Sequence, residues 1–477
     1  MTFEKETLEL TNNAGSTSSD EESGADLKYE QELIRRVDWR LLPILGALYS
    51  IALIDRTNLS NANVAGMNKD LGLNIGNRYS IALLVFFIPY MLFELPSNLV
   101  LRRVGAAKWL GTIAFCWGVV MIGMGFVHDW RVLTVCRTII GFFEAGLFPG
   151  CVYLVSSWYV RFEVQKRMAI FFLISVFVGG FSSILAYGLM QMDGVGGLAG
   201  WRWIFIIEGI ITVLVALFSF LAIIDFPDKV LAKRNGRFLS ATDVEIIKGR
   251  IERDRADSIA DPITWAKVGK HLSDFKLWVF ALLFMCTAVP AYAFGLFLPI
   301  LLEGMGFTAG MSQLLSTPPY IFACIASFTL SYFADKQRVR GPIIVAQAVM
   351  CISGLATIAY FSTVGIRYSG VFIGMAGAVG NIPSVLSYQS NNIRTNSKRS
   401  VSSAVQVGFG AVGGIYASLV FRSVDAPRYL PGLWATIACQ LAMIVIVGFM
   451  SVYFKMQNRK QKEGKHLEGH PDFTYTL

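Results

Sequence analysis

The chain has 477 residues, of which 54% are hydrophobic and 16% are charged, and its formal net charge is +9. Soluble domains carry about 25% charged residues, so this composition excludes an ordinary soluble globular protein. The mean hydropathy of +0.53 is high enough to predict many membrane-spanning segments. We therefore expect the lipid bilayer to be a partner of the chain. The basic residues should reflect membrane topology, with no nucleic-acid partner.

The N-terminal segment, residues 1–36, is predicted to be a disordered cytoplasmic tail, because its first thirty residues are polar, acidic and poor in apolar side chains. It holds no apolar core of the kind that a cleavable signal peptide needs, so the first apolar stretch should be a retained helix. Lys and Arg gather in alternate loops along the chain. By the positive-inside rule, this alternation places both termini in the cytoplasm.

Apolar stretches of about 20 residues, the length that crosses a bilayer core, fill most of the remaining chain. Six lie in residues 37–224 and six in residues 277–455, separated by a polar cytoplasmic linker at 225–276 and followed by a cytoplasmic tail at 456–477. The predicted fold is an all-α membrane protein with 12 transmembrane helices in two six-helix bundles. The predicted spans are Leu41–Val64, Tyr79–Leu101, Trp109–Val127, Val132–Trp158, Met168–Met190, Trp203–Ile224, Leu277–Leu302, Leu314–Ala334, Pro342–Ser362, Ser369–Tyr388, Val401–Phe421 and Leu433–Phe454.

The linker contains one clear helix signal. Ser240 is followed three residues later by Asp243, and a charged stretch runs on to Arg255. A serine at the cap and an acid three residues on can each satisfy an exposed amide, so the spacing predicts a capping box that opens a solvated helix.

The charged residues that interrupt the apolar spans fall mainly in two places: Asp55 and Arg56 in the first span, and Arg137 and Glu144 in the fourth. A charge at the bilayer centre costs about 2.5–3.5 kcal/mol or more, so such residues usually line an ion or substrate route. Arg137 and Glu144 are seven apart, which puts them on one helix face about 10 Å apart along the axis. That gap leaves room for a partner from another helix, and Asp55 or Arg56 would fit. Since the histidines all fall in loops or tails, carboxylates should carry any protons.

Two loops resemble the GxxxDRxGRR loop of the major facilitator superfamily, in which two six-helix halves enclose a midplane site. Asn98–Lys108 follows the second span, and Ser331–Arg340 occupies the matching place in the second half. In the first copy Arg102 stands where the family has an acid, whereas Asp335 keeps the acid in the second. The resemblance implies gating roles for three residues, namely Arg103, Asp335 and Lys336.

A more specific set of motifs resembles the fungal allantoate permease branch of the anion:cation symporter family. Together the motifs span most of the chain between Asp38 and Lys455. The resemblance implies proton-coupled uptake of a small organic anion, such as a vitamin acid, a nicotinate-like acid or a ureido acid, by a monomer in the plasma membrane. The motifs are Val37–Pro43, Ile54–Ala62, Phe93–Asn98, Arg137–Gly150, Gly200–Gly209, Asp225–Asp228 and Ser390–Ile393.

The same resemblance implies that Asp55 and Glu144 are the proton-linked groups and that Arg56 and Arg137 bind the anion and pair with these acids. With both acids ionised, each arginine is expected to have an internal partner. Protonation would remove that partner, and a substrate carboxylate would take its place. Two structural alternatives stay open: Asp55 and Arg56 form a pair that only holds the first span in place, or Arg137 extends to the membrane interface.

Further substrate contacts are expected from polar side chains in the spans. The alternative is that these groups only bond helix to helix, because Asn and Gln do this in many membrane proteins. Glu94, Arg202 and Glu208 are predicted to be structural. The substrate-contact candidates are Asn58, Tyr292, Asn381 and Gln389.

Other functions are compatible with some of these features. A drug:proton antiporter or metabolite exporter shares this fold, but the Gly-Pro pair typical of such antiporters is missing from Phe177–Ser183. A passive facilitator or a non-transporting sensor stays open. The seven cysteines lie inside apolar segments without CxxC spacing, so no metal site or cofactor is predicted. No nucleophile with a base is visible, and no catalytic residue is predicted.

Overall fold

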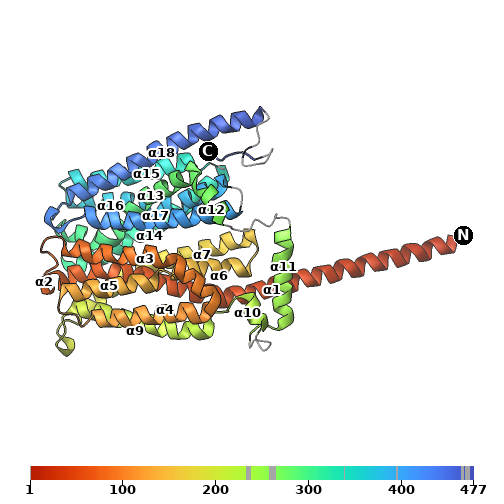
Figure 1. The fold of residues 1–477 in the computed structure, drawn as a ribbon, viewed down its shortest axis with the longest axis horizontal. Helices are drawn as coiled ribbons and strands as arrows, with labels where there is room; N and C mark the ends of the chain where they lie inside the picture. Colours follow the sequence, from red (N-terminus) through yellow and green to blue (C-terminus); the bar gives the residue numbers. More distant parts are fainter. Residues whose placement is uncertain are drawn as a thin grey trace.

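The structure, a computed structural model, consists of helices that form two bundles lying side by side (Figure 1). The linker helices and both chain ends lie at the same end of these bundles (Figure 1). We call this end the linker side and the opposite end the far side. Side chains are described from Lys28 onward, except at a few positions such as Asp335. The described residues are 2–232, 238–256, 265–337, 339–393, 396–463, 467 and 473–477.

The first bundle contains the helices that precede the linker. Its long packed pairs are α4 with α9 and α3 with α5, while α1 packs against α7 and α9. Two of its spans are interrupted, one between α5 and α6 and the other between α7 and α8. The elements are α1 (Thr2–Ala62), η1 (Asn63–Met67), α2 (Asn68–Asp70), α3 (Arg78–Val104), α4 (Ala106–Met124), α5 (Trp130–Glu144), α6 (Leu147–Trp158), α7 (Arg161–Gly180), α8 (Ser182–Met190), η2 (Val195–Gly197) and α9 (Gly200–Ala222).

The second bundle follows three short linker helices. Within it α15 packs along α16 and α13 packs along α17. The two bundles meet where α3 contacts α17, α1 contacts α13, and α14 contacts α7 and α8. The elements are α10 (Pro227–Ala232), α11 (Ala241–Ala256), α12 (Trp265–Leu272), α13 (Phe275–Glu303), α14 (Ala309–Gln337), α15 (Gly341–Tyr360), α16 (Val364–Asn392), α17 (Asn396–Val420), η3 (Ser423–Asp425) and α18 (Leu430–Lys462).

The helices are long and apolar enough to cross a membrane. In the described part of the chain ten pass this test, and the bent pair Arg78–Glu94 and Pro96–Val104 makes an eleventh span with a bend of 54°. Pro96 begins the second part of the pair, and a proline inside a helix removes one hydrogen bond and favours such a bend. The shorter apolar helix Phe177–Met190 lies where the fifth span was predicted. The predicted all-α membrane fold in two bundles is confirmed.

The N-terminal segment differs from the predicted disordered tail. In the structure α1 begins at Thr2, and its first part projects away from the bundles (Figure 1). Residues near its base contact other elements: the Tyr29 hydroxyl donates to Asp243 Oδ1 at 2.7 Å, and Glu30 lies 3.6 Å from Arg250. The prediction for 1–36 rested on low apolar content and could not include these contacts, which are long-range in sequence.

The capping box predicted in the linker is present. The amide of Asp243 donates to Ser240 Oγ at 3.1 Å, and the amide of Ser240 donates to Asp243 Oδ2 at 2.9 Å. Two amides at the start of α11 are thus satisfied reciprocally. The charged helix ends at Ala256, one residue beyond the predicted Arg255.

Close helix packing in the second half depends on small residues. A methyl group added to Gly354 of α15 would overlap the backbone of Gly374 and approach the Gly370 carbonyl on α16. Side chains larger than hydrogen at these positions would separate the two helices. Gly414 of α17 likewise lies directly against the ring of Phe87 on α3, so a glycine also lets the two bundles approach each other.

Candidate functional site

The central charged contact joins α1 to the end of α5. Arg56 Nη2 lies 2.5 Å from Glu144 Oε1, and Arg56 Nε donates to the same oxygen at 2.7 Å. The Glu144 side chain is 1% exposed and that of Arg56 is 12% exposed. The Arg56 guanidinium also lies over the ring of Tyr90 at 5.1 Å. Arg56 is thus a partner for Glu144 from another helix, for which the sequence spacing left room.

Glu144 lies at a break in its span. It is the last residue of α5, and α6 begins at Leu147 after Ala145 and Gly146. A methyl group on Gly146 would overlap the Ser97 hydroxyl on α3, so glycine is needed for this close approach. In membrane transporters, breaks of this kind place backbone and side-chain groups toward a midplane site. The sequence analysis did not predict this break, although Gly146 and Pro149 are signals for one.

Arg137 is buried without a carboxylate partner. It is 2% exposed, and its guanidinium lies 4.8 Å from the centre of the Phe86 ring on α3. Its Nε has no hydrogen-bond acceptor, and within the described ranges no acid lies at ion-pair distance from it. The expectation that each arginine has an internal partner is therefore wrong for Arg137. The reason is geometric: Arg56 meets Glu144 at one end of α5, two turns from Arg137.

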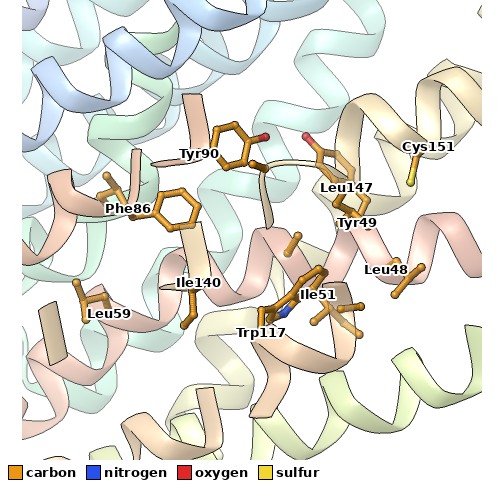
Figure 2. Packing of buried hydrophobic residues seen from close by; sticks show 14 of the residues in the cluster. Leu48, Tyr49, Ile51, Leu59, Phe86, Tyr90, Trp117, Ile140, Leu147 and Cys151 are labelled. Carbon is orange, nitrogen blue, oxygen red and sulfur yellow. The ribbon is translucent and has the colours of Figure 1, made fainter. Parts of the chain in front are cut away.

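The surroundings of these charges are apolar. Figure 2 shows Phe86, Tyr90 and Trp117 in one cluster with Ile51 and Leu59 of α1, the residues that flank the charged pair in sequence. Charges interact more strongly in such surroundings than in water, because the local dielectric is low.

Asp55 has a different environment from its neighbour Arg56. It is 1% exposed, and its Oδ2 accepts a hydrogen bond of 2.9 Å from the indole nitrogen of Trp117 on α4. The Asn58 amide lies 3.5 Å from Asp55 Oδ1. Along the part of the chain that the structure covers, Asp55 has no cation at ion-pair distance, so the expected pairing of Asp55 with an arginine is absent. Adjacent helical residues point about 100° apart, which accounts for the separation.

Glu208, which was predicted to be structural, lies close to Asp55. It is 2% exposed on α9, and neither of its carboxyl oxygens has a hydrogen-bond partner. Thr212, one turn later, lies 3.5 Å from Asp55 Oδ2 and donates to the Glu208 carbonyl at 2.8 Å. The signal for Glu208 in the sequence was an acid in an otherwise apolar span. The position of Glu208 near α1 depends on tertiary packing, which no local sequence pattern predicts.

The substrate-contact candidates of the second half lie in different environments. Tyr292 is half-buried and meets Phe87 of the other bundle edge-on, with ring centres 5.0 Å apart. Asn381 is fully buried, and both atoms of its amide lack a partner. Gln389 donates to the Ser402 hydroxyl within its own bundle. Tyr292 and Asn381 thus keep polar groups available, whereas Gln389 is engaged in a helix-to-helix contact.

The residues predicted for gating lie at the linker side. The Arg103 and Lys336 side chains are exposed, and in the regions that the structure covers neither makes an ion pair; the side chain of Asp335 is outside the described residues. The Arg103 carbonyl accepts a hydrogen bond of 2.8 Å from Lys229 of α10. Its neighbour Arg102 lies 3.1 Å from Asp228. The first loop therefore contacts the linker in this conformation.

The two bundles are joined by hydrogen bonds at the far side. The Tyr79 hydroxyl at the start of α3 donates to the Leu296 carbonyl of α13 at 3.3 Å, and Tyr79 also meets the Phe297 ring edge-on at 5.8 Å. Ser80 donates to the Phe421 carbonyl at 3.5 Å. These contacts close the far side between the bundles.

The fold and the site together define a multi-pass membrane protein in which two helical bundles enclose buried charges. The chain belongs to the Major Facilitator Superfamily, which it matches over residues 45–418. Its relatives are named as transporters, and the chain is accordingly a membrane transporter of this superfamily with a small-molecule substrate.

Individual similarities agree with this assignment. The chain is 31% identical to the MFS-type transporter cnsO of Penicillium expansum, over 93% of this chain and 86% of that protein. It is 28% identical to the high-affinity nicotinic acid transporter of Saccharomyces cerevisiae, over 91% of this chain and 79% of that protein. A bacterial homolog of the human lysosomal transporter Spinster, solved inward-facing and unoccupied, shares the fold with a TM-score of 0.65 at 14% identity, covering 88% of this chain and 95% of that one.

Proposed function

We propose that this transporter carries a small organic anion, of the carboxylate class, into the cell together with protons, as in the allantoate permease branch of the anion:cation symporters. The observation that carries the proposal is a contrast between two arginines, Arg56 largely buried and Arg137 fully buried: within the described residues Arg56 has a carboxylate partner and Arg137 has none. A guanidinium in apolar surroundings binds a carboxylate through two parallel hydrogen bonds. The relative named as a nicotinic acid transporter supports an organic acid as substrate.

The coupling follows from competition for Arg56. While Glu144 is ionised, it occupies the Arg56 guanidinium with two contacts to one oxygen. A proton on Glu144 removes the negative charge that pairs with Arg56. Arg56 and Arg137 then both lack an ionised carboxylate partner. A substrate carboxylate lowers the cost of these charges. Proton and anion binding therefore favour each other, which is the thermodynamic condition for symport.

The remainder of the substrate is proposed to contact the second bundle. Tyr292 of α13 packs against Phe87 of the first bundle. The buried amide of Asn381 on α16 offers both a donor and an acceptor. A flat acid with a ring would suit an aromatic neighbour and a polar amide. As part of the same proposal both termini face the cytoplasm, so that the far-side contacts between the bundles lie toward the outside of the cell.

The experiment is uptake of labelled organic anions, nicotinate among them, by cells that express the full chain, at acidic and at neutral pH, with and without a protonophore. Glu144→Gln imitates a permanently protonated Glu144. This variant is expected to lose acid-driven accumulation and to keep exchange of labelled for unlabelled anion, because exchange needs no net proton movement. Glu245→Gln, an exposed residue of α11, is the matched control.

Two outcomes would contradict the proposal. Accumulation by the wild type that is insensitive to both pH and protonophore would rule out proton coupling. Net efflux of preloaded substrate against its gradient would identify an exporter instead. Arg137→Lys separates substrate binding from coupling: it is expected to raise KM about tenfold or more, since an ammonium cannot reproduce the planar two-point contact.

A further inference from the structure

A second buried acidic group lies between α1, α4 and α9, apart from the Arg56–Glu144 pair. Asp55 and Glu208 are both about 1–2% exposed, and the Asn58 amide lies beside Asp55 and approaches Glu208. Asp55 is within electrostatic reach of Glu208. The Arg56–Glu144 pair is a compensated pair of charges, whereas this group consists of two acids without a bound cation.

The helices around Glu208 bring no cation to it. Its own helix carries Arg202, but that guanidinium donates to the Gly125 carbonyl at 2.9 Å. The charged neighbour on α1 is Asp55. Asp55 also interacts electrostatically with Glu144 and Arg137 of α5 across the bundle. η1 carries no titratable residue. The helices α4 and α8 carry three titratable side chains, Lys108, Cys116 and Tyr187. None of these interacts electrostatically with Glu208.

The hydrogen bonds distinguish the two acids. Asp55 accepts a bond of 2.9 Å from Trp117, which stabilises an ionised carboxylate. Within the described residues neither Glu208 oxygen has a donor at hydrogen-bond distance, although the Asn58 amide lies nearby. The single hydroxyl proton of Thr212 points to the nearer acceptor, the Glu208 carbonyl at 2.8 Å. An ionised carboxylate without donors in apolar surroundings is strongly disfavoured, so Glu208 is the neutral member of the two.

We infer that Asp55 and Glu208 form a proton-binding site separate from the Arg56–Glu144 pair, with Glu208 holding the resident proton. The two acids carry one negative charge between them in this conformation. Binding of a further proton at an Asp55 oxygen makes the two acids together neutral. Release of either proton gives them one negative charge again. The assignment of this proton to transport rests on the proposed function, while its presence on Glu208 does not.

The first test is infrared spectroscopy of the full-length protein in lipid vesicles at about pH 8, recorded as the difference between H₂O and D₂O. The wild type is expected to show the carbonyl stretch of a protonated carboxyl that shifts in D₂O and is lost in Glu208→Gln. Glu245→Gln should leave this band unchanged. A band that is the same in Glu208→Gln and in the wild type would overturn the assignment.

The second test measures transport. Glu208→Gln is expected to reduce acid-driven accumulation about tenfold while leaving anion exchange within about twofold of wild type. A purely structural Glu208, permanently protonated, predicts that this near-isosteric variant keeps wild-type accumulation, and that result would remove Glu208 from the coupling mechanism. If the wild type itself shows no acid-driven accumulation, the proposed function fails, and the infrared result still decides where the proton is held.

A third variant keeps the inference testable where Glu208→Gln does not fold. Trp117→Phe preserves an aromatic side chain but removes the donor to Asp55. Losing this donor disfavours ionised Asp55, so the pH midpoint at which Asp55 takes up the further proton, seen as a second carbonyl band, should rise by about one unit. An unchanged midpoint in Trp117→Phe would show that the two acids do not titrate as one group.

Discussion

The side-chain amide of Gln313 on α14 donates a hydrogen bond of 3.0 Å to the backbone carbonyl of Asn61 on α1. Both residues are fully buried, and the bond joins the two bundles at the far side. In a protein that alternates between two conformations, a contact made in only one of them shifts the balance by its own free energy. The Gln313–Asn61 bond therefore favours the conformation closed at the far side.

Gln313→Ala is expected to shift this balance toward the conformation open at the far side. A hydrogen bond contributes about 1 kcal/mol, which corresponds to a change of about fivefold in the conformational equilibrium. Hydrogen–deuterium exchange should then rise in η1 and at the start of α14. Gln337→Ala, an exposed glutamine at the other end of α14, is the control. Equal exchange in both variants would mean that the bond does not distinguish the two conformations.

The two buried arginines should respond in opposite ways to removal of their charge. Arg56→Met leaves Glu144 buried without its partner, which is expected to lower stability by about 3–5 kcal/mol. Arg137→Met removes a buried cation that has no carboxylate partner, so its Tm should equal or exceed that of the wild type. The measurement is thermal unfolding of the purified protein in detergent.

A double variant checks the reasoning for Arg56. Removing both partners in Arg56→Met with Glu144→Met should recover most of the stability lost in Arg56→Met, because no uncompensated charge remains. A double variant as unstable as Arg56→Met would show that the arginine contributes mainly through packing against Tyr90 and Phe86.

Part of this site could be predicted from the sequence. The spacing of Arg137 and Glu144 left room for a partner from another helix, and Arg56 takes such a position beside Glu144. The spacing could not decide between Asp55 and Arg56, because adjacent residues of one helix face different neighbours and the neighbours are set by packing. The bundles themselves followed from apolar segment lengths, which are a local property.

Other features depended on tertiary contacts that leave no local pattern. Glu208 lies about 150 residues from Asp55 in sequence, and only the packing of α9 on α1 brings them together. The lack of a partner for Arg137 could not be foreseen either, because the spacing of Arg137 and Glu144 does not show which side chains of other helices lie beside each of them. The gating prediction for Asp335 stays a prediction.

The close contact of α15 with α16 gives a prediction about stability. Gly354→Ala places a methyl group against the backbone of Gly374 and Gly370, which cannot give way as a flexible side chain would. Overpacking of this kind is expected to cost about 1–3 kcal/mol, seen as a lower Tm. Gly448→Ala in α18 is the matched control, since nothing lies within 4 Å of the added methyl group. A Tm for Gly354→Ala equal to that of this control would show that the two helices separate without cost.

Asp243 links α1 to the linker helix α11 and predicts a pH dependence. Partial burial acts to raise its pKa, but the hydrogen bonds from the Tyr29 hydroxyl and from Ser240 outweigh this, so the pKa of Asp243 is held below its usual value. A group with a lowered pKa in the folded state stabilises that state above its ordinary value of about 3.9, and this contribution is lost as the pH falls through the lowered pKa. The contact should therefore persist throughout the neutral and mildly acidic range.

The measurement is hydrogen exchange of the α11 amides, corrected for the intrinsic rate at each pH. Protection should be constant from about pH 7 to about pH 5 and should fall only below about pH 4. Asp243→Asn should lower protection already at neutral pH, because the ionised acceptor for Tyr29 and the reciprocal half of the capping box are weakened together. Glu245→Gln, exposed on the same helix, should behave as the wild type. If protection instead falls between about pH 7 and about pH 5, groups other than Asp243 hold the linker to α1.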